Sequence, residues 1–218
     1  MQQILDWSEA WALLIPITVL LLNKKSRSVH KPVVLYVCIA LVLNFSQNYI
    51  WQNGISFDFT SQPGDNIFIY NTHSIIRLLL FSWFFIQIKQ PILSWVKKMI
   101  PVIFIVFVLI NFTVFEKYTD FSSRTFSLET GLLLFLCLLY YVNILVQDQQ
   151  VVYKKNPAFW ITTGLSIYVV ITFPIFLFYK EISAKYEYFA IHIWDLHNIS
   201  YIIFCIFITK AFHLSKYE

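Results

Sequence analysis

The sequence predicts an all-α membrane protein, folded as a bundle of seven transmembrane helices. Hydrophobic residues make up 58% of the 218 residues, and the mean hydropathy is +0.65. Only 13% of the residues are charged, whereas soluble domains carry about 25%. Apolar stretches close to the roughly 20 residues that one membrane crossing needs follow one another along almost the whole chain. Most side chains are therefore expected to face lipid or the bundle interior rather than water.

The apolar stretches define the helices and leave only short loops between them. We expect one domain over residues 1–218, with helices at about 7–22, 32–51, 67–88, 100–115, 126–145, 158–179 and 188–212. Pro32, Pro101 and Pro157 fall at expected helix starts, where a missing N–H is tolerated. Pro16 and Pro174 fall inside helices, where each removes a backbone hydrogen bond and predicts a kink.

The basic residues predict the orientation of the bundle. Alternate gaps and the C-terminal end contain Lys24, Lys25, Arg27, Lys31, Lys89, Lys97, Lys98, Lys154, Lys155, Lys210 and Lys216. The opposite side has only Lys117, Arg124, Lys180 and Lys185. Because cytoplasmic loops are enriched in Lys and Arg, the N-terminus is expected outside and the C-terminus in the cytoplasm. The net charge of +4 then belongs to one membrane face and does not indicate nucleic-acid binding.

Faint similarities between the first three and the last three helices suggest an internal repeat. His73-Ser74-Ile75 in the third helix is matched by His197-Asn198-Ile199 in the seventh. The first and fifth helices each carry an acid near the outer end, Glu9 and Glu129. These matches would give a 3 + 1 + 3 arrangement of parallel repeats with the fourth helix as a linker. Apolar sequences also produce such matches by chance, so the sequence leaves the repeat open.

The strongest candidate for chemistry is Arg77, near the middle of the third helix. A charge in hydrocarbon is unfavourable and usually has both a partner and a function. The helical period puts one set of polar residues on a shared face: Tyr70, His73, Ser74 and Arg77. Side chains lean toward the start of their helix, so Arg77 should reach outward, to a carboxylate or a hydrated cavity. Glu129 and Asp195 are the available acids, and such a pair could lock the bundle, bind a ligand, or do both.

A second polar face lies on the outer half of the second helix. It contains Asn44, Gln47, Asn48 and Trp51, which follow the helical period. These side chains could form hydrogen bonds between helices. They could also line a pocket together with the face of Arg77, and the number of polar residues on one stripe favours the pocket.

The seventh helix carries His192, Asp195, His197 and Asn198. His192 and His197 are separated by about 140° around the helix, so they cannot hold one metal ion as an i, i+4 pair would. A site that combines His73, Asp195 and one of these histidines stays open, but no metal or other cofactor is assigned. The histidines could instead hydrogen-bond to neighbours or respond to pH. Glu129 is expected in the first turn of its helix, where the helix dipole favours a carboxylate.

One segment resembles a known family. Asn156-Pro157-Ala158-Phe159-Trp160, followed by Gly164 and Tyr168, looks like the sixth helix of small seven-helix proteins common in Bacteroidota, and Asn198-Ile199 is similar too. Members of that family often accompany, or are fused to, sensor kinases and response regulators. The resemblance covers the last third of the chain and implies a signalling input at a bacterial inner membrane. It supplies no ligand or catalytic residues.

We therefore expect a multi-pass inner-membrane sensor or receptor-like protein that takes a small ligand or a proton from outside and signals to a cytoplasmic or membrane partner. The alternatives are a small-solute transporter with 3 + 1 + 3 helices and a metal-dependent membrane hydrolase; no catalytic residue is assigned. The expected ligand-binding residues are Arg77, His73, Tyr70, Asp195, Glu129, Asn44, Gln47, Asn48, Asn198 and His192.

Overall fold

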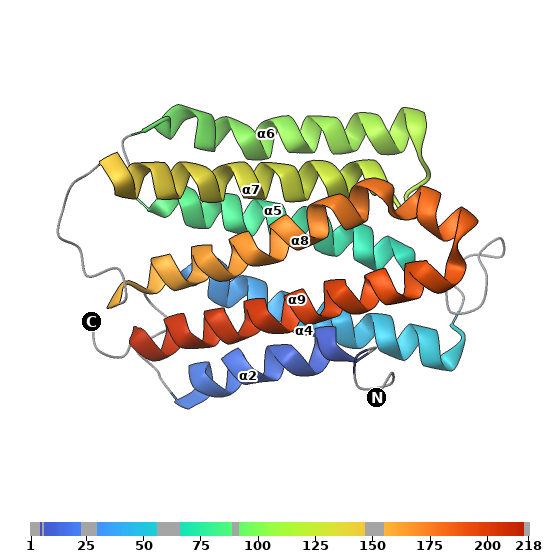
Figure 1. Ribbon diagram of the computed structural model, residues 1–218, viewed down its shortest axis with the longest axis horizontal. Coiled ribbons are helices and arrows are strands. Elements are labelled where there is room, and N and C mark those ends of the chain that lie inside the picture. The colour runs from blue at the N-terminus through green and yellow to red at the C-terminus, as the bar shows by residue number, and fades with distance from the viewer. Residues whose placement is uncertain are drawn as a thin grey trace.

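Figure 1 presents the computed structural model of the chain, which describes Leu5 and residues 7–22, 30–55, 66–88, 92–146 and 155–215. The described residues form helices and no strands, which confirms the predicted all-α class. The helices are α2 (Ser8–Leu22), α4 (Lys31–Asn53), α5 (Ile67–Gln87), α6 (Ser94–Ile110), α7 (Ser123–Val146), α8 (Pro157–Lys185) and α9 (Glu187–Leu214). Among the basic residues that predict the orientation, those outside the described residues are Lys24, Lys25, Arg27, Lys89, Lys154 and Lys216.

Six of these helices are long and apolar enough to cross a membrane, namely α4, α5, α7, α8, α9 and α6 with its π-helical extension η1 (Asn111–Phe115). The remaining helix, α2, is apolar but has only 15 residues. At 1.5 Å per residue it is about 22 Å long, against a hydrocarbon core of about 30 Å. The structure thus supports a multi-pass membrane protein with six long spans and one shorter helix. Pro16 and Pro174 lie inside α2 and α8, as predicted, and α8 extends to Lys185, beyond its expected end near residue 179.

The expected start of the fourth helix was wrong. The helix begins at Ser94 rather than near residue 100, so Pro101 lies inside α6 instead of at its first turn. Lys97 and Lys98 consequently belong to α6 and not to a loop. The physical reason is that a lysine near a helix end can keep its stem among apolar groups while its ammonium reaches a more polar region, so lysines do not mark a loop.

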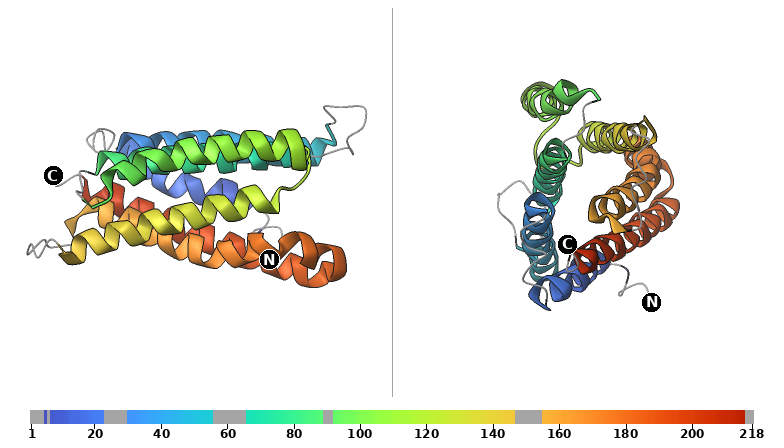
Figure 2. Two further views of the ribbon diagram at one scale, coloured as in Figure 1. Left: turned by 90° about the horizontal axis from the view of Figure 1, so that it is seen from above. Right: turned by 90° about the vertical axis from the view of Figure 1, so that its left-hand side faces the viewer.

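Six helices form a closed ring. In the end-on view of Figure 2, α2, α4, α5, α7, α8 and α9 follow one another around the ring, and α9 closes onto α2. The peripheral α6 lies outside the ring against α5 and α7, and many of its apolar side chains are exposed, as expected for a lipid-facing helix. The helices α2, α5, α7 and α9 begin at the same end of the bundle, which we call the N-terminal end (right in Figure 1).

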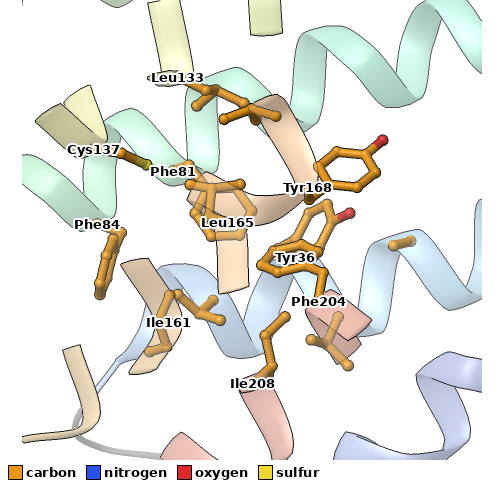
Figure 3. Close-up of a cluster of buried hydrophobic side chains, with 14 of the residues drawn as sticks. Tyr36, Phe81, Phe84, Leu133, Cys137, Ile161, Leu165, Tyr168, Phe204 and Ile208 are labelled. Carbon is orange, nitrogen blue, oxygen red and sulfur yellow. The ribbon is translucent and has the colours of Figure 1, made fainter. Parts of the chain in front are cut away.

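An apolar core fills the ring toward the opposite, C-terminal end. Figure 3 shows part of this core, which includes Phe81 and Phe84 from α5, Ile161 from α8 and Ile208 from α9; all four are fully buried. Tyr168 lies at one edge of this cluster and carries its hydroxyl away from the other labelled side chains. Polar groups inside the ring are therefore concentrated in the half of the bundle nearer the N-terminal end.

A partly buried histidine at the C-terminal end provides the first testable prediction. His30 precedes α4 and its ring packs edge-on against Phe84, with centroids 5.5 Å apart. Burial lowers the pKa of His30 from 6.5 to about 4. The unfolded chain therefore binds a proton between these pH values while the folded protein does not, so stability present above pH 6.5 is lost as the pH falls toward 4.

We expect His30→Gln to remove this part of the acid sensitivity, which amounts to up to about 3 kcal/mol. The measurement is the thermal unfolding midpoint of parent and variant in detergent across the acidic range. Parallel pH profiles for the two proteins would contradict the prediction.

Candidate functional site

A buried ion pair joins α5 to α7. The Arg77 guanidinium donates from Nε to Oε1 of Glu129 and from Nη2 to Oε2, the latter over 2.7 Å. Arg77 is 4% exposed and Glu129 is fully buried. Two parallel N–H···O contacts of this kind form the strongest type of charge-assisted pair. Of the two acids expected to neutralise Arg77, Glu129 is the one that binds it.

Two hydroxyl groups complete the surroundings of this pair. Ser74 Oγ donates to Oε2 of Glu129 over 2.7 Å, and Arg77 donates from Nη1 to the Tyr168 hydroxyl over 2.7 Å. The contact from Tyr168 brings α8 into the same network. Glu129 is the seventh residue of α7 and not in its first turn. Its carboxylate is thus held by Arg77 and Ser74 rather than by the helix terminus, which corrects the expected placement.

A second polar pair joins α2 to α9. His197 Nε2 lies 2.8 Å from Oε1 of Glu9, and the two side chains are only 4% and 12% exposed. Two amides fix the backbone beside this pair: Asn44 Nδ2 donates to the Glu9 carbonyl over 2.7 Å, and Asn198 Nδ2 donates to the Leu5 carbonyl over 3.1 Å. The beginning of the short α2 is therefore held by α4 and α9 through polar contacts.

A small cavity lies between the two pairs. Its volume is about 10 Å³, and it is lined by Glu9, Tyr70, His73, Ser74, Arg77, Phe126, Phe176, Trp194 and His197. A volume of about 10–15 Å³ is the minimum for one water molecule. A pocket among these polar residues is therefore no larger than a water-sized space in this conformation, and its opening to the outside stays a prediction.

Two histidines that line the cavity each carry an imidazole nitrogen with no hydrogen-bond partner among the described residues. These nitrogens are Nε2 of His73 and Nδ1 of His197, and both side chains are almost fully buried. The His73 ring stacks on Tyr36, with centroids 5.9 Å apart. Buried polar atoms normally have hydrogen-bond partners, so each of these two nitrogens requires an explanation such as a bound water or ion.

A cluster of aromatic side chains forms part of the cavity wall. The indole of Trp194 packs against Tyr70, Phe176, Tyr179 and Phe121, with ring centroids 5.2–6.4 Å apart. Phe126 joins them through a contact with Phe176 at 5.0 Å. We call these six residues the aromatic cap. Trp194 also lies 5.0 Å from the His197 ring, so a change at His197 acts directly on the cap.

The structure divides the ten expected ligand-binding residues into three sets. Tyr70, His73 and Arg77 line the cavity, in agreement with their shared helix face, and Glu129 is bound to Arg77 behind it. Asn44 and Asn198 hold the start of α2. The remaining four do not line the cavity, and they are Gln47, Asn48, His192 and Asp195.

The polar stripe on α4 is divided in the same way. Asn44 and Gln47 point into the protein and are buried, whereas Trp51 is 68% exposed. His192 and Asp195 form a contact of 3.5 Å with each other, and the His192 side chain is 53% exposed. Residues that share one helix face by their spacing therefore need not all point into the protein.

Sequence reasoning did not assign Glu9, Tyr168, Phe126, Phe176 or His197 to the ligand-binding site. Glu9 carried a usable signal, because a carboxylate in an otherwise apolar helix indicates a partner or a function. Tyr168 carried none, since it is one of 13 tyrosines and only the fold brings it to Arg77. The two phenylalanines are likewise ordinary members of apolar helices.

No three His, Cys, Asp or Glu side chains among the described residues lie close enough together to hold a metal ion. His73 and His197 share the cavity, but Asp195 and His192 are elsewhere. Comparison with protein-family models, with curated proteins and with solved structures finds no match to this chain.

Proposed function

We propose that this chain is a membrane sensor whose input is a proton or a small ligand at the cavity between α2, α5 and α9. The N-terminal end faces outside in this proposal, and the cytoplasmic ends of the helices report to a partner chain. The observation that carries it is the Glu9–His197 pair, an ionisable contact between two helices at the edge of a cavity with unsatisfied imidazole nitrogens.

The position of this pair supports a switch. Protonation of His197 would change its contact with the Glu9 carboxylate from a hydrogen bond donated by a neutral imidazole to an ion pair, and so would change how firmly α9 holds α2. Tyr168 from α8 and the Trp194 ring also face His197, while His73 and Arg77 lie across the cavity on α5. A proton can shift the packing of these helices only by binding more tightly to one arrangement than to the other.

The apolar core favours a sensor over a channel. Between Tyr168 and the C-terminal end of the bundle, side chains such as Phe81, Phe204 and Leu165 are fully buried and carry no polar group. Ions and protons need polar partners along their path through a membrane. A signal can cross this region as helix movement, whereas a solute would require the core to open.

Acidification should therefore move the aromatic cap. We expect the fluorine resonance of fluorotryptophan at position 194 to shift when reconstituted protein is taken from neutral pH to about pH 5, the range in which histidines change charge. Trp194→Phe assigns the resonance. His197→Gln should abolish the shift, because glutamine can still hydrogen-bond to Glu9 but does not titrate.

His30→Gln is the matched control, since it removes a histidine at the C-terminal end and should leave the Trp194 response intact. A shift that survives in His197→Gln, or a resonance of Trp194 that does not respond to pH in the parent protein, would overturn the proposal.

A transporter is the second candidate, and one observation favours it. The three helices α2, α4 and α5 and the three helices α7, α8 and α9 form two rows, while α6 lies outside the ring between α5 and α7 (Figure 2). This resembles two three-helix units joined by a linker helix. Proteoliposomes that contain a pH-sensitive dye distinguish the candidates: dissipation of a proton gradient faster than in empty vesicles supports transport, and an unchanged rate supports the sensor.

A further inference from the structure

We propose that the cavity binds an ammonium group, with the ammonium ion itself as the species that fits this conformation. This inference rests on the proposed function, because it names the ligand that the same cavity would sense besides a proton. It is carried by the size of the cavity, by its unsatisfied acceptors, by its charge and by its aromatic wall.

The size of the cavity limits which ligands fit in this conformation. A cavity of about 10 Å³ has room for one particle about the size of water. The ammonium ion is close to water in size, whereas a larger organic molecule would need the aromatic cap to open. The cap residues Trp194, Tyr70 and Phe176 are side chains on three different helices, so a methyl group could be admitted by small ring rotations rather than by helix movement.

The acceptors match a particle that only donates hydrogen bonds. In the tautomer in which His197 Nε2 carries the hydrogen and donates to the Glu9 carboxylate, Nδ1 has a free lone pair, and it has no partner among the described residues. Nε2 of His73 is also unpartnered and accepts in the tautomer that carries the hydrogen on Nδ1. Together with the Glu9 carboxylate, these residues offer acceptors from α2, α5 and α9 around one space. Four N–H donors of an ammonium ion satisfy such a set better than the two O–H donors of a water.

The charge of the cavity also favours a monovalent cation. The positive charge of Arg77 is matched by its bidentate contact with Glu129. With neutral histidines, Glu9 leaves the cavity with one unbalanced negative charge. A buried charge without a counter-charge is strongly unfavourable. An ammonium ion removes the imbalance without protonation of His197, so the proton and the ammonium ion are alternative ways to neutralise the same site.

The aromatic wall distinguishes ammonium from metal cations. Faces of tryptophan, tyrosine and phenylalanine attract ammonium groups within about 6 Å, and Trp194, Tyr70, Phe126 and Phe176 all line the cavity. Hard metal ions instead require about six to eight oxygen ligands, and the described residues contain no group of three or more His, Cys, Asp and Glu side chains that could hold a metal ion. Potassium is similar to ammonium in size but gains nothing from imidazole nitrogens that accept directional hydrogen bonds.

The test uses the full chain in lipid nanodiscs, labelled with fluorotryptophan and held at neutral pH. Ammonium chloride is titrated against potassium chloride at constant ionic strength, with methylammonium and tetramethylammonium as further probes. We expect a saturable shift of the Trp194 resonance with ammonium, a weaker response to methylammonium, and none to potassium or tetramethylammonium.

Two variants and one control locate the binding site. Glu9→Gln should raise the ammonium dissociation constant by about tenfold or more, because it removes the charged partner of a hydrogen bond. His73→Phe keeps a ring in place, removes the acceptor and should weaken binding several-fold. Glu181→Gln removes an exposed carboxylate near the same end of the bundle and should have no effect. Circular dichroism and gel filtration establish that each variant is folded, and the affinity of His73→Phe decides the question if Glu9→Gln does not fold.

The outcomes separate this inference from the proposed function. Equal shifts with ammonium and potassium, or ammonium binding that both Glu9→Gln and His73→Phe leave unchanged, would overturn the ammonium site. A Trp194 resonance that responds to pH through His197 but not to ammonium would also overturn it, while the proton sensor would stand. No response to either would end both proposals.

Discussion

Replacement of Arg77 by methionine is expected to destabilise the protein by about 3–5 kcal/mol, because it leaves the Glu129 carboxylate buried without its counter-charge. Glu129 is fully buried, and its other hydrogen-bond partner is the Ser74 hydroxyl. A single neutral hydrogen bond offsets little of the cost of a buried carboxylate. Unfolding in mixed detergent micelles, followed by circular dichroism, measures the change in the free energy of unfolding.

A double variant tests whether the loss comes from the orphaned charge. Arg77→Met combined with Glu129→Met removes both charges and fills similar space, so it should recover most of the stability lost by Arg77→Met alone. The single substitution Arg124→Met is the matched control. Arg124 lies 3.9 Å from Glu116, its side chain is 58% exposed, and exposed pairs contribute at most about 1 kcal/mol. An Arg77→Met variant as stable as Arg124→Met, or a double variant less stable than the single one, would contradict this account.

The Arg77 pair also illustrates which parts of the site could be predicted from the sequence. An arginine in an apolar helix is visible at once, and the helical period correctly put Tyr70, His73 and Ser74 beside it, since all four line one cavity. The partner could only be narrowed to two acids, Glu129 and Asp195, because the choice depends on which helix faces α5 in the ring. Local sequence carries no information on that neighbour.

The same limit applies to the fold. Among the described residues, hydropathy located each of the seven α-helices, with the largest errors at the start of α6 and the end of α8, because membrane helices are set by the length of their apolar stretches. The ring order, the peripheral position of α6 and the polar contacts that hold the short α2 depend on packing between helices. The size of the cavity was unpredictable for the same reason. Its wall is formed by aromatic rings from α5, α7, α8 and α9 that are ordinary apolar residues in the sequence.

The second large effect is expected at Gly164, where α8 packs tightly against α9. An ideal Cβ at Gly164 would lie 2.4 Å from Cβ of Phe207 and 3.3 Å from Cδ2 of Phe204. Cβ of Phe207 is attached to the backbone of α9 and cannot move away by a change of rotamer. Gly164→Ala must therefore push α8 and α9 apart, and this is the helix pair that also positions Tyr168 beside His197.

We expect Gly164→Ala to lower the free energy of unfolding by about 1–3 kcal/mol, the usual range for an overpacked core. Gly131→Ala in α7 is the matched control, because its added Cβ would meet only the ring edge of Phe173 at 3.4 Å. There the helix preference for alanine over glycine, about 0.5–1 kcal/mol, makes the substitution neutral or slightly stabilising. The same detergent unfolding measures both variants, and equal stability for the two would mean that α8 and α9 are not packed backbone to backbone at Gly164. Since the separation of these helices displaces Tyr168 from His197, Gly164→Ala should also alter the pH response of Trp194, whereas Gly131→Ala should preserve it.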